Sequence, residues 1–257
     1  MGAKEKVILR RAAQYDPTDI AKIIREGLEE FGVAGKIQGR ITVKPNVVMA
    51  HHKVTPSAYT RSEFVDGLFS ALEGVAQKDS TITVAEKCGA AIPTSRMFRR
   101  AGYYKLEKKH KIKLLPIEES RKKTVHLNKG KIHEKIRTAK AIADRNFLIY
   151  APKLKTNSLS HGLTAAIKLN IGILCDGERM WNHNYNLDEK IVDLLEVGYP
   201  DFIATGAVSQ RKSRRFFPSC PAWGWSEPGF PSGAFSKSPH AFSTGKRVRN
   251  VLAPHSF

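Results

Sequence analysis

Residues 147–156 read FLIYAPKLKT, and the fold is best inferred outward from this stretch. Its first four residues form a continuous apolar run of strand length, followed by Ala151 and Pro152. Apolar runs of this kind are typical of strands buried within a sheet. The sequence therefore predicts a buried strand over 147–150 that ends in a polar loop carrying Lys153 and Lys155.

Strand-like and helix-like segments alternate on both sides of this stretch. We expect strands at 7–9, 41–43, 81–85, 112–117, 147–150 and 202–205, and helices within 17–31, 60–75, 94–101, 103–110, 163–170 and 187–197. A turn at 128–130 predicts a hairpin over 125–132, inserted into the pattern. Such alternation predicts an α/β fold: a mainly parallel sheet with helices on both faces, and a site at the carboxyl ends of the strands.

Two helix starts carry local signals. Asp16 precedes Pro17, a pairing typical of an N-cap followed by a first-turn proline. Thr60 and Glu63 have the spacing of a capping box, which predicts that Thr60 caps the next helix.

Composition excludes several classes of protein. The chain has 257 residues, of which 41% are hydrophobic, too many for a disordered protein. No apolar run is long enough to span a bilayer, and the charged N-terminus does not resemble a secretory signal, so we expect a cytoplasmic protein without a membrane partner. Cys88, Cys175 and Cys220 are widely spaced, and three cysteines cannot build a four-cysteine zinc or iron-sulfur site.

The formal net charge of +19 is concentrated in two stretches. Residues 96–140 hold 16 basic and 4 acidic residues, and residues 206–257 hold 8 and 1. Clustered lysine and arginine residues can form a nucleic-acid footprint by releasing counterions from phosphates. Because no nucleic-acid-binding motif accompanies segment 96–140, we favour the alternative that its charges lie on a solvated helix face and a hairpin rim.

The C-terminal stretch differs in composition from the rest. Residues 206–257 contain 6 of the 13 prolines, 9 serines and 6 phenylalanines, without helical or alternating periodicity. One interpretation is a disordered basic arm, although such arms are poor in aromatic residues. The favoured interpretation is a frameshift near residue 206. The predicted organisation is an α/β domain over 1–205, incomplete at its C-terminal end, and an irregular tail over 206–257.

Lysines follow the predicted strands and helix starts. If separate loops converge at one edge of the sheet, their ammonium groups would form a pocket for phosphate or carboxylate. Ser158, Ser160 and Thr164, with free amides of a helix starting near Leu163, would complete an anion cradle. The alternative is a set of unrelated surface lysines. The candidate ligand-binding residues are Lys44, Asn46, Lys153, Lys155, Thr156, Thr164 and Lys168.

Two further residues are candidates for acid–base chemistry. His161 lies in a polar loop, where an exposed imidazole can move a proton at neutral pH, although a histidine without a role is the commoner case. Glu86 ends the strand predicted over 81–85; it would orient a lysine or bind a metal, or simply pair with one of the many cations. The sequence lacks Walker, dinucleotide-binding and serine-hydrolase motifs, and no histidine spacing indicates a metal site.

The order of these motifs resembles the bacterial and archaeal family called domain of unknown function 362, over about residues 5 to 205. The motifs that carry the resemblance are Lys44-Pro45-Asn46, Thr55-Pro56, Ala85-Glu86, Ala101-Gly102-Tyr103, Pro152-Lys153-Leu154-Lys155-Thr156 and Leu163-Thr164-Ala165-Ala166-Ile167-Lys168-Leu169-Asn170-Ile171-Gly172. The resemblance implies an α/β domain without a settled activity, in a family often associated with iron-sulfur proteins.

This chain departs from the family pattern in three ways. It has no cysteine cluster, so we expect no iron-sulfur cluster within it. Asn157 stands where the family usually has a histidine, which weakens any acid–base or metal role there. Members also continue past residue 205 with an Asp and a Gly-rich loop, whereas this chain continues with the aberrant tail.

Three hypotheses for function follow. The leading one is an enzyme-like protein that binds a phosphate-bearing or carboxylate-bearing small molecule at the strand ends, with an unspecified reaction and an unknown cofactor. The first alternative is a nucleic-acid-binding protein that uses segment 96–140. The second is a redox protein that works with an iron-sulfur subunit.

Overall fold

A computed structural model describes residues 6–55, 57–157, 162–181, 185–207 and 250–253. Its main sheet has seven strands, and every pairing between neighbours is parallel. In spatial order the strands are β1 (Val7–Leu9), β11 (Asn250–Ala253), β10 (Phe202–Gly206), β7 (Phe147–Ala151), β2 (Arg40–Pro45), β3 (Thr81–Glu86) and β4 (Lys113–Pro116). The predicted α/β class and parallel sheet are confirmed.

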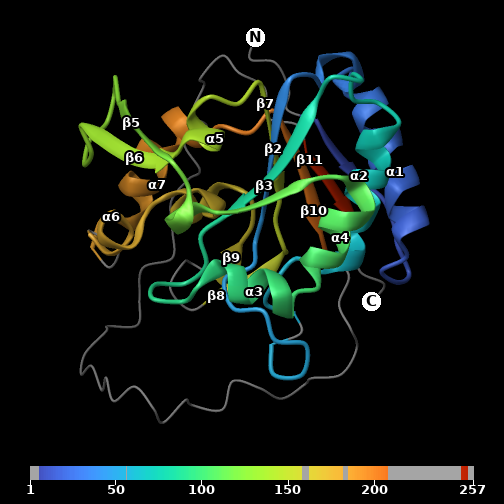
Figure 1. Cartoon of the computed structure of the whole chain (residues 1–257), viewed down its shortest axis with the longest axis horizontal. Coiled ribbons are helices and arrows are strands. Elements are labelled where there is room, and N and C mark those ends of the chain that lie inside the picture. Colours follow the sequence, from blue (N-terminus) through green and yellow to red (C-terminus); the bar gives the residue numbers. More distant parts are fainter. Residues whose placement is uncertain (1–5, 56, 158–161, 182–184, 208–249, 254–257) are drawn as a thin grey trace, which may run out of the picture.

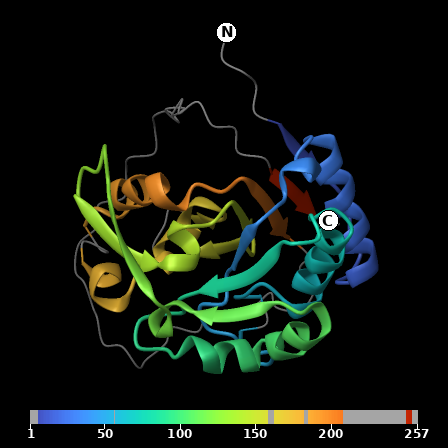
Figure 2. The ribbon, with the colours of Figure 1, turned by 45° about the horizontal axis from the view of Figure 1, so that its top comes forward.

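Helices cover both faces of the sheet (Figures 1 and 2). One layer consists of α1 (Pro17–Glu30), α2 (Ser62–Glu73), α3 (Thr94–Arg100) and α4 (Tyr103–His110). The other face carries α5 (Lys140–Ala143), the 3₁₀ helix η3 (Ile167–Ile173) and α7 (Leu187–Gly198). Shorter elements are the 3₁₀ helices η1 (Ala34–Lys36) and η2 (Ile117–Glu119), and helix α6 (Asp176–Met180).

Strand β7 shows how the sequence builds two cores. Its five residues are all buried, and successive side chains point to opposite faces. Phe147 and Ile149 pack with α1 to α4, whereas Leu148 and Tyr150 pack with η3 and α7. The unbroken apolar run is therefore required because both faces are covered.

The helix starts show one correct and one wrong prediction. Asp16 caps α1, and its carboxylate accepts hydrogen bonds from the amides of Thr18 at 2.9 Å and Asp19 at 3.0 Å. The capping box predicted at Thr60 is wrong, because α2 begins after Arg61 and no side chain caps it. Thr60 is instead held by the strand ends described below.

The helix predicted over 163–170 is wrong at its start, and the part from Ile167 onward is a 3₁₀ helix. Thr164 lies in β9 (Gly162–Thr164), which pairs antiparallel with β8 (Lys155–Asn157), and the chain then forms the 3₁₀ helix η3. Pairing with the neighbouring strand β8 overrides the local helical pattern. Consequently, no helix N-terminus near Leu163 supplies amides for the predicted anion cradle.

The inserted hairpin is confirmed, with longer strands than predicted. It consists of β5 (Lys122–His126) and β6 (Lys135–Ala139). Asp193 of α7 anchors the connection between them, because its carboxylate accepts hydrogen bonds from the amides of residues 131, 132 and 133 at 2.8–2.9 Å.

Of the predicted tail, the structure describes Gly206, Ala207 and strand β11. Residues 250–253 lie between β1 and β10 and pair with both in parallel. Residues 208–249 and 254–257 lie outside the described residues, so the boundary at residue 205 and the frameshift stay predictions. None of the helices in the described ranges has the length and hydrophobicity needed to cross a bilayer.

Candidate functional site

Several predicted site residues lie where β2, β3 and β7 end. These strands are adjacent and parallel, with β2 at the centre, so their carboxyl ends meet at one edge of the sheet. Lys44 lies at the end of β2 and Asn46 directly follows it, Glu86 ends β3, and Lys153 and Lys155 follow β7. In Figure 1 this edge lies at the lower end of the sheet, beside β8 and β9.

The centre of the site is a buried ion pair. Lys44 Nζ lies 2.7 Å from Glu86 Oε1, and the two side chains are 1% and 2% exposed. Glu86 also accepts hydrogen bonds from the amides of Val47 at 3.2 Å and Lys87 at 2.9 Å. Burial lowers the pKa of Lys44 and raises that of Glu86, while each partner opposes the shift in the other. Both partners are needed, because removal of either one would leave the other charge buried without a counter-ion.

Gly172 in η3 packs directly against this pair. A Cβ atom at residue 172 would lie 2.6 Å from Glu86 Oε1 and 2.7 Å from Lys44 Nζ. The carbonyl oxygen of Gly172 also accepts a hydrogen bond from the amide of Lys87 at 3.2 Å. Glycine is therefore required here because any side chain would displace one of the charges.

Thr60 joins the ends of β2 and β7. Its hydroxyl donates to the carbonyl of Ala151 at 2.7 Å and accepts from the amide of Asn46 at 3.2 Å. Its own amide donates to the carbonyl of Asn46 at 2.8 Å, and Tyr103 donates its hydroxyl to the carbonyl of Thr60 at 2.8 Å. These bonds fix the backbone at Asn46, from which the amide side chain extends toward Lys155.

Lys155 places a partly buried ammonium group among neutral oxygen atoms. Its Nζ donates to the carbonyl of Ala58 at 2.6 Å and lies 3.5 Å from Asn46 Oδ1. Across the described ranges, no carboxylate lies within ion-pair distance of this nitrogen. Burial lowers the pKa of Lys155 to about 8, with Glu86 opposing the shift and Lys168 adding to it.

Lys153 is the more buried of the two lysines in this loop, at 4% exposure. Its Nζ donates to the hydroxyl of Tyr15 at 2.9 Å. Burial lowers the pKa of Lys153 to about 8, and the charges of Arg61 and Lys155 lower it further. The two lysines therefore interact electrostatically within one cationic site.

Lys168 lies at the start of η3 and contributes to the same electrostatic field. Its pKa is lowered by burial, which Asp188 partly offsets. Its charge in turn lowers the pKa of Lys155. The structure thus pairs Lys44 with Glu86 and places Lys155 near Asn46, Lys153 and Lys168, whereas convergence of the lysines around an open anion pocket stays a prediction.

The remaining predicted residues belong to the β8–β9 pair or to the connection between its strands. Thr156 and Thr164 lie in the β8–β9 pair, where Thr156 is opposite Leu163 and Thr164 is opposite Lys155. Ser158, Ser160 and His161 lie outside the described residues. The predicted roles of these residues stay predictions.

Sequence reasoning missed four residues that shape the site. These are Tyr15, Thr60, Lys87 and Gly172. Lys87 is 2% exposed and pairs with Asp176 at 3.0 Å, which ties β3 to α6. Only Thr60 carried a local signal, and that signal indicated a helix cap. The contacts of the others join segments far apart in the sequence.

Chemically, the site offers cations and amide groups and little metal-binding capacity. Within the described ranges, no group of three or more His, Cys, Asp or Glu side chains is placed to hold a metal ion. Ammonium groups held among neutral oxygens bind phosphate or carboxylate oxygens well, because each new contact is a charge-assisted hydrogen bond. A lysine whose pKa is near 8 also exchanges protons near neutral pH.

The comparison with protein families agrees with the motifs quoted above. The family described as Domain of unknown function (DUF362) matches residues 41–215, which include every strand end of the site. The chain belongs to the DUF362 family. The match confirms the resemblance inferred from the sequence. Among the curated proteins, none matches this DUF362 chain.

Proposed function

We propose that this DUF362 protein binds a small anion, bearing phosphate or carboxylate groups, above the carboxyl ends of β2 and β7. The proposal rests chiefly on Lys155, whose ammonium group has a carbonyl and an amide oxygen as partners rather than a carboxylate. A partly buried cation without an ion-pair partner costs free energy, part of which a bound anion would recover. The position also fits the rule that open α/β sheets bind ligands at the carboxyl ends of their strands.

The predicted residues take different roles in this proposal. Lys153 and Lys155 would supply the positive charge, Asn46 and Thr156 the hydrogen bonds, and Lys168 and Thr164 further contacts to the anion. Lys44 acts indirectly: Glu86 already neutralises it, so the pair positions the end of β2. An enzyme-like role for the protein remains part of the proposal, with His161 as the candidate acid or base.

A bound anion would raise the pKa of both lysines. Because these values now lie at about 8, binding at pH 8.5 should draw protons from solution. Calorimetry in two buffers of different ionisation enthalpy measures this uptake directly. The proton uptake separates the proposed site from surface lysines, which are already fully protonated at that pH.

The experiment is a titration of the full chain with phosphate, pyrophosphate, malonate and citrate at pH 8.5. We expect at least one of these anions to bind with proton uptake, and Lys155→Gln to weaken that binding at least tenfold. Lys22→Gln provides a matched control, because Lys22 lies on the exposed side of α1. Failure of all four anions to bind, or equal weakening by both variants, would contradict the proposal.

The nucleic-acid alternative makes a different prediction. Binding through segment 96–140 would fall steeply with salt for any oligonucleotide and would be insensitive to Lys155→Gln. The redox alternative requires a partner subunit, so it predicts iron and visible absorbance only in a complex purified without oxygen.

A further inference from the structure

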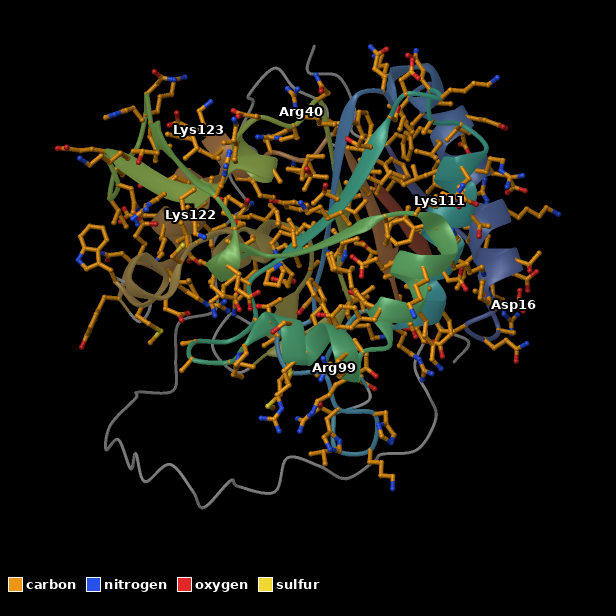
Figure 3. The ribbon with its side chains drawn as sticks, viewed as in Figure 1. Asp16, Arg40, Arg99, Lys111, Lys122 and Lys123 are labelled. Carbon is orange, nitrogen blue, oxygen red and sulfur yellow. The ribbon has the colours of Figure 1, made fainter. Side chains whose placement is uncertain are left out.

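A second cationic feature lies at the opposite end of the sheet. An open cavity of about 730 Å³ is lined by Arg40, Lys113, Leu115, Glu119, Ser120, Arg121, Lys140, Ala141, Asp144 and Arg145. Arg40 begins β2 and Lys113 begins β4, so the cavity includes the amino-terminal ends of these two strands, and the other end of β2 belongs to the site described above. Figure 3 shows Arg40 near the upper end of the molecule, with Lys122 and Lys123 of the hairpin to its left.

The lining carries five cationic and two anionic side chains. Asp144 is already engaged, because Lys123 lies 2.5 Å and Lys140 4.0 Å from its carboxylate oxygens. Arg40 Nε donates to the carbonyl of Asp144 at 2.8 Å, which holds the guanidinium at the cavity. The positive charge of the lining therefore exceeds what its own carboxylates neutralise.

Two of these cations are available to a ligand. Lys113 and Arg121 are exposed, and no carboxylate of the described residues lies within ion-pair distance of either. They come from different elements, since Lys113 begins β4 whereas Arg121 precedes β5. Together with Lys140, at the start of α5, they place separate charges around one cavity rather than along one helix face.

The composition of the lining limits the ligand class. The cavity has the volume of a small-molecule site, and several separated cations suit a ligand with several linked anionic groups. Its lining residues with apolar side chains are Leu115 and Ala141, and it includes no aromatic ring on which a base would stack. Recognition of single-stranded nucleic acid normally uses such rings. The ligand that best suits this lining is a chain of phosphate groups.

We propose that this cavity binds a linear polyphosphate, with Lys113, Arg121 and Lys140 contacting successive phosphate groups and Arg40 fixing one end. The ligand is either inorganic or the phosphate chain of a nucleotide. This proposal is independent of the site at the strand carboxyl ends. It assigns a role to part of the basic segment 96–140 that the predicted anion site leaves unexplained.

The test is calorimetric titration of the full chain with inorganic triphosphate and with ATP. We expect both to bind, with affinities within about tenfold of each other, because only the phosphates are contacted. The double variant Lys113→Gln/Arg121→Gln should weaken both at least tenfold. The matched control Lys105→Gln/Lys108→Gln removes two exposed charges of α4, outside the cavity, and should leave both affinities unchanged.

Two further measurements distinguish this cavity from the strand-end site and from a general effect of charge. With the strand-end site weakened by Lys155→Gln, the triphosphate binding that the cavity variant removes should persist, and its loss in Lys155→Gln would overturn the proposal of a second site. Equal losses in the α4 control would also overturn it, because they would show that net charge alone drives binding. Tighter binding of a 20-nucleotide single strand than of triphosphate, abolished by the cavity variant, would replace the proposal with a nucleic-acid surface.

Discussion

At the scale of single residues, the protein depends on buried charges that are tolerable only with their partners. Lys44 and Glu86 lie on adjacent strands, far from water, and Gly172 leaves them the space they occupy. Such a pair contributes little net stability, but removing one partner leaves an uncompensated charge in the interior.

The first prediction concerns this pair. Glu86→Gln should reduce the free energy of unfolding by about 3–5 kcal/mol, because the Lys44 ammonium remains buried without a counter-ion. The double variant Lys44→Met/Glu86→Gln should be more stable than Glu86→Gln alone. Urea denaturation of both variants measures the difference, and a double variant as unstable as the sum of the singles would refute the coupling.

The second prediction concerns pH. Burial lowers the pKa of Lys155 from 10.5 to about 8 in the folded state. Between these values the unfolded chain binds more protons than the folded chain, so stability contributed by this residue rises with pH. Below pH 8 both states are charged, and the cost of burial is constant.

Accordingly, the wild-type protein should gain stability relative to Lys155→Met as the pH rises from 8 toward 10.5. Denaturation of both proteins at pH 7, 8, 9 and 10 tests this expectation. A constant difference between the two proteins across this range would mean that the ammonium group titrates normally.

At the scale of elements, close packing between α1 and α2 determines how the first helical layer lies on the sheet. Gly67 in the middle of α2 is buried, and Ile20 of α1 packs directly over it. A Cβ at residue 67 would lie 2.6 Å from Ile20 Cγ2 and 2.7 Å from the carbonyl of Pro17. Glycine has a low helix propensity, but its missing side chain permits this close approach of the two helices.

The third prediction is that a Gly→Ala change in α2 has the opposite effect on stability to the one expected from helix propensity alone. In an exposed helix, Gly→Ala adds about 1 kcal/mol of stability. Gly67→Ala should instead destabilise the protein by about 1–3 kcal/mol, because the added methyl group forces the helices apart. Gly35→Ala, where nothing lies within 4 Å of the added atom, provides the control. Relative to the wild-type protein, the unfolding temperatures of the two variants should shift in different directions or by clearly different amounts.

At the scale of the whole molecule, the sheet joins residues from the two ends of the sequence. Strand β1 pairs with β11, and β11 pairs in turn with β10. Within the described residues, β11 is the sole neighbour of β1. The structure therefore gives residues 250–253 a place in the sheet, whereas the composition of 206–257 predicts a tail that is not part of the evolved fold.

These two views predict different outcomes for truncation. If β11 contributes to the sheet, a chain ending at residue 249 should unfold at lower temperature and show faster hydrogen exchange in β1 and β10. We expect this loss, because parallel pairing of β1 would be removed. Unchanged stability and exchange would favour the frameshift interpretation.

The sequence by itself determined the α/β class, the parallel sheet, the positions of most elements and the concentration of lysines at strand ends. These features follow from local patterns: apolar runs of strand length, helical spacing, and polar residues where the runs stop. The strand ends were predictable because a parallel sheet brings its carboxyl ends to one edge.

Only the tertiary structure decided which charges neutralise one another. The pairing of Lys44 with Glu86, the hydrogen bonds of Thr60 and the approach of Gly172 join residues separated by dozens of positions. The 3₁₀ helix η3 and the β8–β9 pair also replaced a predicted helix, here through pairing between segments that are close in the sequence. Local patterns record which residues face a core, whereas the partner of a buried charge is fixed by the distance between side chains after the chain has packed.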